Sequence, residues 1–235
     1  MPGMIWHSSH FPSGATGMGS LNVGILAIWN DVRPESDADY ETWFCGEHLR
    51  ERVGILGFQF GRRYVAVDGR SPCFFTYYET TGPGVLRSAA YAERVANPTP
   101  LTRHVMANVV VDMIRTVCVR DASDGALRGS QAVVVRASTL SASGLAATWP
   151  QVLALPGRVR SELWLSAETG QAASVEEQIR GRDQKIAASL LVEFNTAALA
   201  ASAASTISAL LAGKPEIAIG AYQLYCTLDQ RDLRS

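Results

Sequence analysis

His48 is the side chain of this sequence best suited to acid–base chemistry. An imidazole has an ordinary pKa near 6.5, so it can accept a proton from a phenol or an enolisable carbon at neutral pH. A helix is predicted over 37–53, with Ser36 placed as its cap. On that helix His48 follows Phe44 by one turn, lies beside Trp43, and would face a cavity between helix and sheet. The alternative is a structural histidine whose ring is hydrogen-bonded locally and fixes the packing of the helix.

Two arginines, Arg62 and Arg63, lie on a strand predicted over 58–67. Side chains alternate along a strand, so the even-numbered residues from 58 to 64 should share one face and Arg63 should lie on the other. One of the two guanidinium groups could therefore reach into the cavity and hold a carboxylate or an enolate through its fixed fork of donors. The alternative is an ion pair with a glutamate of the preceding helix, Glu47 or Glu51.

Aromatic side chains near these groups would form the walls of a pocket for a small hydrophobic or aromatic ligand. Buried tyrosine and tryptophan are also common in an ordinary core, where a hydrogen bond satisfies the hydroxyl or N–H group. The residues expected to contact the ligand are Trp43, Phe58, Phe60, Tyr64 and Tyr77.

These side chains are positioned by a unit with the order β-α-β-β-α-β. Runs of apolar and β-branched residues predict its strands, and capping and proline signals delimit its helices. The strands are predicted over 23–29, 58–67, 73–79 and 108–119, and the helices over 37–53 and 85–96. The Asp68-Gly69 pair predicts a hairpin turn, so the second and third strands should be antiparallel neighbours.

The same order of elements recurs in the second half of the chain, which indicates an internal repeat. Strands are predicted over 132–137, 158–165, 189–196 and 216–226, with helices from Ser141 toward Leu153 and over 197–212. Extra residues, including a short helix near 175–180, interrupt the second copy. The predicted division is an N-terminal arm at 1–20, a first repeat at 21–121, a linker at 122–130 and a second repeat at 131–235.

The strands of both copies show little alternation of apolar and polar residues, for example at 133–135 and 190–192. An antiparallel sheet with one wet face should alternate, so both faces of each sheet must be covered. The helices of one copy cover one face. At roughly 25 cal/mol per Å² of apolar surface, leaving the other face in water would cost more than the net stability of a domain, about 5–15 kcal/mol. The two sheets are therefore expected to pack face to face.

The segments around His48 resemble a family motif. YETWFCGEHL at 40–49, ILGF at 55–58 and RRY at 62–64 resemble the pattern Y-x-x-W-(x)4-H-L…PGF…RRY of EthD-like proteins, which belong to the dimeric α+β barrel superfamily. Leu56 stands where the family has proline, which Pro156 keeps in the second copy. The resemblance implies an α+β fold: two tandem ferredoxin-like repeats packed sheet to sheet as a barrel within one chain. The superfamily includes cofactor-free monooxygenases, small cyclases or isomerases and haem-binding relatives, so the fold alone fixes no function.

The second copy lacks the features that single out the first. It has ELW at 162–164 where the first copy has RRY, and it contains no histidine. We therefore expect one functional pocket, in the first repeat, and no haem, since the haem-binding relatives use an axial histidine in their second unit. His7 and His10 fall in the arm, and His104 falls in a proline-flanked loop and should be exposed. No metal site is expected.

The composition excludes several classes of partner. The 21 Lys+Arg and 22 Asp+Glu give a net charge of −1 and are spread evenly, so no basic surface for nucleic acid is expected. No P-loop, GxGxxG, HExxH or GxSxG motif is present, and no cofactor is expected. No signal peptide or CxxC pair is present, and no apolar run approaches the ~20 residues that cross a bilayer. We expect a cytoplasmic protein, monomeric or homodimeric, that does not bind membranes.

The predicted function is that of a cofactor-free enzyme, of the oxygenase or isomerase type, acting on an aromatic or polyketide-like compound. His48 would be the base and Arg62 or Arg63 would hold the anion. The alternative, from a different class, is a non-catalytic binding or accessory protein that holds a hydrophobic ligand in the same cavity. A third interpretation has side chains filling the cavity.

Overall fold

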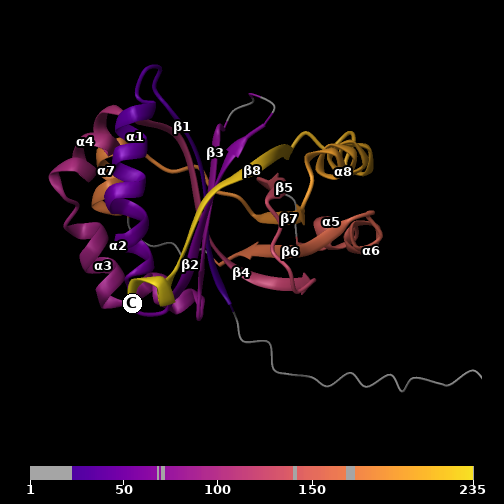
Figure 1. The fold of residues 1–235 in the computed structure, drawn as a ribbon, viewed down its shortest axis with the longest axis horizontal. Helices are drawn as coiled ribbons and strands as arrows, with labels where there is room; N and C mark the ends of the chain where they lie inside the picture. Colours follow the sequence, from indigo (N-terminus) through magenta and orange to yellow (C-terminus); the bar gives the residue numbers. More distant parts are fainter. Residues whose placement is uncertain (1–22, 68, 70–71, 140–141, 168–172, 235) are drawn as a thin grey trace, which may run out of the picture.

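The computed structural model describes residues 23–67, 69, 72–139, 142–167 and 173–234. The predicted arm at 1–20, Asp68 of the predicted hairpin turn and the predicted helix start at Ser141 lie outside them. Within the described residues, eight strands close into one barrel and helices cover it on two opposite sides (Figure 1).

The first β-α-β-β-α-β unit forms as predicted, with one additional helix. Its strands are β1 (Gly24–Val32), β2 (Phe58–Ala66), β3 (Phe74–Thr80) and β4 (Val110–Asp124). One continuous helical segment joins β1 to β2 and consists of α1 (Asp37–Trp43), a π-helical turn η1 (Phe44–His48) and α2 (Leu49–Val53). Between β3 and β4 lie the 3-10 turn η2 (Pro83–Arg87), α3 (Ala89–Ala96) and α4 (Pro100–Asn108).

Helix α4 was not predicted, because the prolines before it were interpreted as helix breakers. Pro100 instead occupies the first position of the helix, where the N–H group that proline lacks would have no partner in any case. Thr99 caps the helix, accepting a hydrogen bond from the Thr102 N–H at 3.0 Å. The prediction that His104 lies in a loop is therefore wrong; it is exposed, as expected, but on a helix.

The second unit repeats this order, with an extra helix between its second and third strands. Its strands are β5 (Gln131–Ala137), β6 (Arg158–Ser166), β7 (Ala188–Phe194) and β8 (Ile217–Asp229). Its helices are α5 (Ala142–Ala146), α6 (Trp149–Leu153), α7 (Val175–Arg180) and α8 (Ala197–Leu210), and the 3-10 turn η3 (Gln230–Arg234) follows β8.

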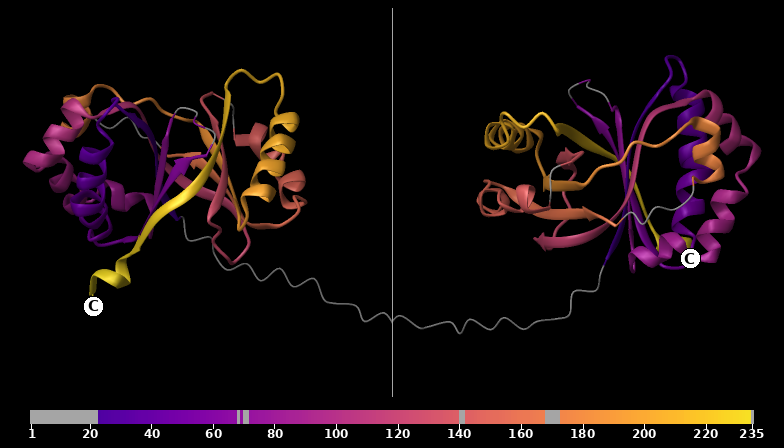
Figure 2. Two further views of the ribbon diagram at one scale, coloured as in Figure 1. Left: turned by 45° about the horizontal axis from the view of Figure 1, so that its top comes forward. Right: turned by 180° about the vertical axis from the view of Figure 1, so that it is seen from behind.

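The two sheets join through their edge strands. The order around the barrel is β1-β3-β2-β8-β5-β7-β6-β4. Strand β2 pairs with β8, where Arg62 lies opposite Thr227, and β4 pairs with β6, where Cys118 lies opposite Ser166. Because the barrel closes, each of the eight described strands is paired along both of its edges. Figure 2 shows the helices of the first repeat on one side of the barrel and α5, α6 and α8 of the second repeat on the opposite side. The expectation that the sheets face each other within one chain is confirmed.

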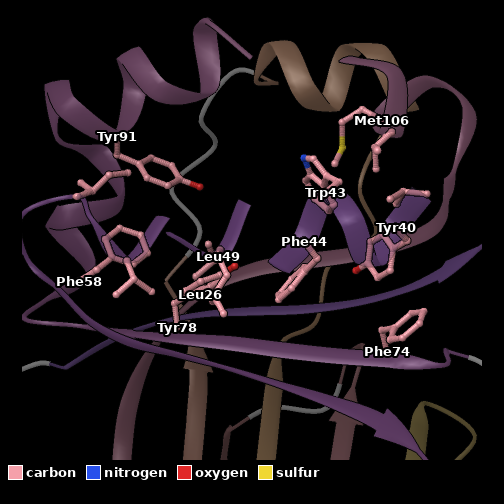
Figure 3. Packing of buried hydrophobic residues seen from close by; sticks show 14 of the residues in the cluster. Leu26, Tyr40, Trp43, Phe44, Leu49, Phe58, Phe74, Tyr78, Tyr91 and Met106 are labelled. Carbon is pink, nitrogen blue, oxygen red and sulfur yellow. The ribbon is translucent and has the colours of Figure 1, made fainter. Parts of the chain in front are cut away.

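Each sheet is covered on both faces by apolar side chains. One cluster lies between the first sheet and its helices and includes Trp43, Phe58 and Tyr78 (Figure 3). A second lies under the helices of the second repeat. The third fills the barrel interior and includes Trp29 and Trp164. Burial on both faces explains why the strands show little alternation.

A β-bulge near the start of β2 alters the predicted alternation. Phe58 lies opposite Thr80, and Phe60 lies opposite Glu79, so Gln59 is an extra residue in the ladder. Phe58 is thereby turned to the helix side of the sheet, whereas Phe60 faces the barrel interior. The prediction that these two phenylalanines share a face is wrong for this reason.

Helix α7 belongs to the second repeat but packs on the first. It lies against α3 and α4, beside the helical layer of the first repeat (Figures 1 and 2). The chain after α7 is fastened to β4, since the Arg115 N–H donates to the Gln184 carbonyl at 3.0 Å and the Gln184 N–H donates to the Met113 carbonyl at 2.9 Å. The predicted short helix at 175–180 therefore covers the other half of the molecule.

Candidate functional site

A cavity of about 30 Å³ lies between the sheet of the first repeat and its helices, and α7 forms part of its wall. At roughly 10–15 Å³ of such volume for one water, it holds about two water molecules. Its apolar walls come from side chains such as Leu26, Phe44 and Met106. Its polar residues include Asn30, Tyr40, His48, Arg52, Thr76, Tyr78, Tyr91, Arg115, Glu176 and Arg180.

His48 is the last residue of the π-helical turn and lines this cavity. It is 7% exposed, and its ring lies 4.1 Å from the Trp43 ring, between centroids. Its Nδ1 atom is buried and has no hydrogen-bond partner among the described residues. Burial, and then the positive charges of Arg52 and Arg180, lower the His48 pKa well below 6.5. The ring is therefore neutral at pH 7, with one nitrogen able to accept a proton.

Three more residues lining the cavity carry a buried polar atom without a partner in the described part of the chain: Arg52 at Nη1, Thr76 at Oγ1 and Tyr78 at its hydroxyl. Burial raises the pKa of Tyr78 well above its ordinary value, so that hydroxyl remains a donor. Buried polar groups are usually paired, and leaving one unpaired costs about 1–3 kcal/mol. With His48 there are four such groups around one cavity, which suits a polar ligand or ordered water.

Positive charge predominates around the cavity. Arg52, from α2, forms an ion pair with Glu176, from α7, which joins the two repeats across the cavity wall. Arg180 pairs with Asp183, at 2.6 and 2.7 Å from Nη2 to the two carboxylate oxygens. The third guanidinium, on Arg115, donates to the neutral Tyr91 hydroxyl at 2.6 Å. An anion formed in the cavity would therefore be stabilised.

The residues predicted for the site are divided by the sheet. His48 and Trp43 line the cavity, and the Trp43 N–H donates to Thr102 Oγ1 at 2.9 Å, which fixes the indole. Arg63 is on the helix side but outside the cavity lining. Its guanidinium donates to the Glu41 carboxylate at 2.5 and 3.1 Å. The alternative of an ion pair with a helix glutamate is therefore correct in kind, but the partner is Glu41 and not Glu47 or Glu51. Phe58 packs beside Tyr91, with ring centroids 6.0 Å apart.

The other predicted residues point into the barrel. Phe60, Arg62, Tyr64 and Tyr77 lie on the interior face, separated from His48 by the sheet itself. Arg62 donates to the Gly129 carbonyl at 2.6 Å. The Tyr64 hydroxyl donates to Glu193 at 2.7 Å, and Arg128 donates to the Tyr77 hydroxyl at 2.9 Å.

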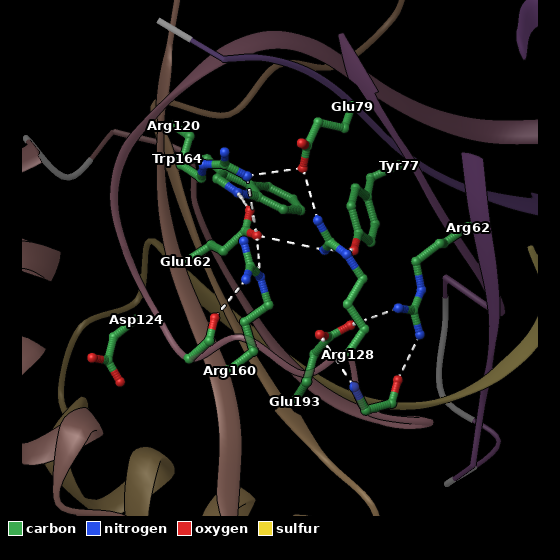
Figure 4. A network of polar contacts seen from close by, with 12 residues as sticks. Arg62, Tyr77, Glu79, Arg120, Asp124, Arg128, Arg160, Glu162, Trp164 and Glu193 are labelled. Carbon is green, nitrogen blue, oxygen red and sulfur yellow. Dashed lines mark hydrogen bonds and ion pairs between the residues drawn. The ribbon is translucent and has the colours of Figure 1, made fainter. Parts of the chain in front are cut away.

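These interior groups belong to a buried network of arginines and glutamates that spans both repeats (Figure 4). At its centre is Glu162, which accepts from Arg160 Nε at 2.6 Å and from the Trp164 N–H at 2.8 Å. Arg120 bridges Glu162 to Glu79, at 3.4 and 2.8 Å. The network pairs its charges internally, and it ties the two sheets together.

Several cavity residues were missed by sequence analysis. Arg52 could have been found, because it follows His48 by one helical turn. Arg115 comes from a distant strand, and Glu176 and Arg180 come from an insertion in the other repeat, so no local pattern links them to His48. Within the described part of the chain, no group of three or more His, Cys, Asp or Glu side chains is placed to hold a metal ion. The helices described there are also too short or too polar to cross a membrane.

Comparison with known proteins supports the fold. No family model and no curated protein matches the sequence. An anthrone oxidase-like protein of known structure matches 89% of this chain and 94% of its own, with 9% sequence identity and a TM-score of 0.60. A provisionally named monooxygenase from Fusobacterium nucleatum matches 88% of this chain and 95% of its own, with 8% identity and a TM-score of 0.52. The chain has the dimeric α+β barrel fold, with both halves of the barrel supplied by one polypeptide.

Proposed function

We propose that the first repeat binds a small aromatic or polyketide-like compound, with only its reacting end in the small His48 cavity, and acts on it without a cofactor, as an oxygenase or isomerase. The observation that carries the proposal is the neutral, buried His48 ring, whose Nδ1 atom has no partner in the described chain. The ring nitrogens of a structural histidine would be expected to form hydrogen bonds with neighbouring groups. The names of the two similar structures, which mention oxidase and monooxygenase chemistry, agree with this choice.

In the proposed step, His48 takes a proton from a phenol hydroxyl or from a carbon next to a carbonyl. The electron pair of the broken bond moves onto the substrate oxygen, giving a phenolate or enolate. Arg52 Nη1 and the Tyr78 hydroxyl, both without partners in the described chain, can donate to that oxygen. The anion-holding role predicted for Arg62 or Arg63 is thus assigned to Arg52.

The fate of the anion distinguishes the two reaction types. In an isomerase, His48 returns the proton to a different atom of the substrate, and no electrons leave it. In an oxygenase, the anion passes electrons to dioxygen, which is then a second substrate. In both types the arginines around the cavity favour the anion over its protonated precursor.

The proposal is tested by comparing wild type with His48→Ala on naphthols and anthrones, following both calorimetric binding and turnover. General base catalysis contributes about 10²–10⁴-fold, so kcat/KM should fall at least 100-fold. The matched control is His104→Ala, which replaces an exposed histidine on α4 and should keep full activity. Binding without turnover in wild type and variant alike would favour a non-catalytic ligand-binding protein. Absence of binding to any of these compounds would refute the proposal.

A further inference from the structure

A second, larger cavity adjoins the first. It has a volume of about 410 Å³ and lies between η2, α3, β4 and the start of α7. Ligand sites typically occupy about 300–1,000 Å³, so this outer cavity has the size of a ligand site and the His48 cavity alone does not. The outer cavity is lined in part by Leu86, Val95 and Val117, which provide an apolar wall.

Tyr91 and Arg115 line both cavities. They touch through the hydrogen bond from Arg115 Nη2 to the Tyr91 hydroxyl, 2.6 Å long. These two side chains therefore form a partition between the outer cavity and His48. A rotation of the Tyr91 side chain would join the two spaces, because that residue contributes to the wall of each.

The two cavities together are rich in positive charge. Five cationic side chains line them, namely Arg52, Arg87, Arg115, Arg180 and Lys185. Three carboxylates oppose these charges: Glu176 and Glu177 in the lining, and Asp183, which pairs with Arg180 behind it. The whole chain has a net charge of −1, so the excess is local. Such a field raises the local concentration of anions and speeds their association.

Arg115 is the group among these best placed to hold an anion. Its hydrogen-bond acceptor is a neutral hydroxyl, and it makes no ion pair within the described part of the chain. Arginine binds a carboxylate through two parallel N–H donors, and such charge-assisted bonds are about twice as strong as neutral ones. A carboxylate would therefore displace the Tyr91 hydroxyl from Arg115 and open the partition.

We propose that the substrate is an elongated hydroxyaromatic carboxylate. Its hydroxyl end reaches His48, and its carboxylate stays in the outer cavity on Arg115, with Lys185 and Arg87 nearby. This inference rests on the proposed function, because it takes the His48 cavity as the place where the hydroxyl end reacts. The inference adds that the protein selects its substrate by the negative charge of the carboxylate as well as by the aromatic surface.

The test uses the full chain and a matched pair of ligands, 6-hydroxy-2-naphthoate and 6-hydroxy-2-naphthamide, with binding measured by calorimetry at low salt. The two molecules differ only in the group at the end away from the hydroxyl, a charged carboxylate in one and a neutral amide of similar size in the other. Wild type should bind the carboxylate about 10-fold or more tightly than the amide, since hydrogen bonds to charged groups have about that strength. Arg115→Gln should remove this preference, so that the carboxylate and the amide bind with affinities within about 2-fold of each other. The control Arg103→Gln replaces an exposed arginine of α4 and should keep the preference for the carboxylate over the amide.

Tyr91→Phe provides a second measurement that keeps Arg115 in place. It removes the hydroxyl that competes for the guanidinium, so it should tighten carboxylate binding more than amide binding and widen the ratio between the two affinities. Equal binding of carboxylate and amide by wild type would overturn the inference, as would a preference that survives in Arg115→Gln. If either ligand still binds and His48→Ala still loses turnover, the proposed function stands without the inference; if neither ligand nor any naphthol binds, both fail.

Discussion

The Arg52–Glu176 ion pair makes the sharpest prediction about stability, because it is buried and joins the two repeats. Arg52 is 3% exposed and Glu176 is 8% exposed. In Glu176→Gln the guanidinium loses its charged partner while Nη1 already has none in the described chain. Breaking a buried pair in this way costs about 3–5 kcal/mol. At about 2–4 °C per kcal/mol for a chain of this size, a loss of 3 kcal/mol lowers Tm by roughly 6–12 °C.

The measurement is urea unfolding together with thermal melting of wild type and three variants. Arg94→Gln breaks an exposed pair with Glu51, in which the Arg94 side chain is 41% exposed, and should cost less than about 1 kcal/mol. The double variant Arg52→Met/Glu176→Leu removes both charges and should recover most of the stability lost in Glu176→Gln. If Glu176→Gln costs no more than Arg94→Gln, the pair is not buried in solution, and α7 does not close the cavity as described.

Four further predictions concern other parts of the molecule. Because the His48 pKa lies well below 6.5 in the folded chain, kcat/KM should stay level as the pH falls through 6.5. In the unfolded chain His48 takes up a proton in that pH range, so the free energy of unfolding should fall by up to about 1.4 kcal/mol for each pH unit below 6.5. The His48→Ala variant should not show this slope. Gly61→Ala places a Cβ atom 2.8 Å from the Tyr78 ring and should cost about 1–3 kcal/mol in urea unfolding. Glu162→Gln removes the carboxylate that pairs with Arg120 and Arg160 inside the barrel. It should lower the free energy of unfolding by about 3 kcal/mol or more and leave the affinity for the naphthoate, measured by calorimetry, unchanged. Burial raises the pKa of Cys226 to about 11, so iodoacetamide at pH 8 should label it much more slowly in the folded chain than in urea.

The fold was largely predictable because its signals are local. The helical segment that carries His48 begins after Ser36, as predicted, although the Ser36 side chain makes no capping hydrogen bond. The strand patterns of the two repeats are visible in short windows of the sequence. The lack of alternation in those strands was sufficient to predict face-to-face sheets, since it reflects burial on both sides. Even the insertion at 175–180 was recognisable as a helix, with Ser174 accepting a hydrogen bond from the Glu177 N–H.

The composition of the site was less predictable, for two physical reasons. A single bulge at Gln59 reverses the face of Phe58 relative to Phe60, and nothing in the residue types marks a bulge, because its cost and gain depend on the neighbouring strand. The same strand then sends Arg62 into the barrel and Arg63 toward the helices, so adjacent arginines serve two unrelated networks. Alternation predicted the separation of this pair but not which partners each would meet.

The position of α7 explains how the proposed site can be confined to one repeat. Strands β2 and β3 are joined by residues 67–73 alone, whereas β6 and β7 are joined by 167–187, which contain α7. In a dimer of identical chains, every copy would need both a site and the insertion that covers its partner's site. In a single chain one repeat can carry the proposed site while the other supplies only its cover. The absence of histidine from the second repeat and the presence of Glu176 and Arg180 there are two results of the same asymmetry.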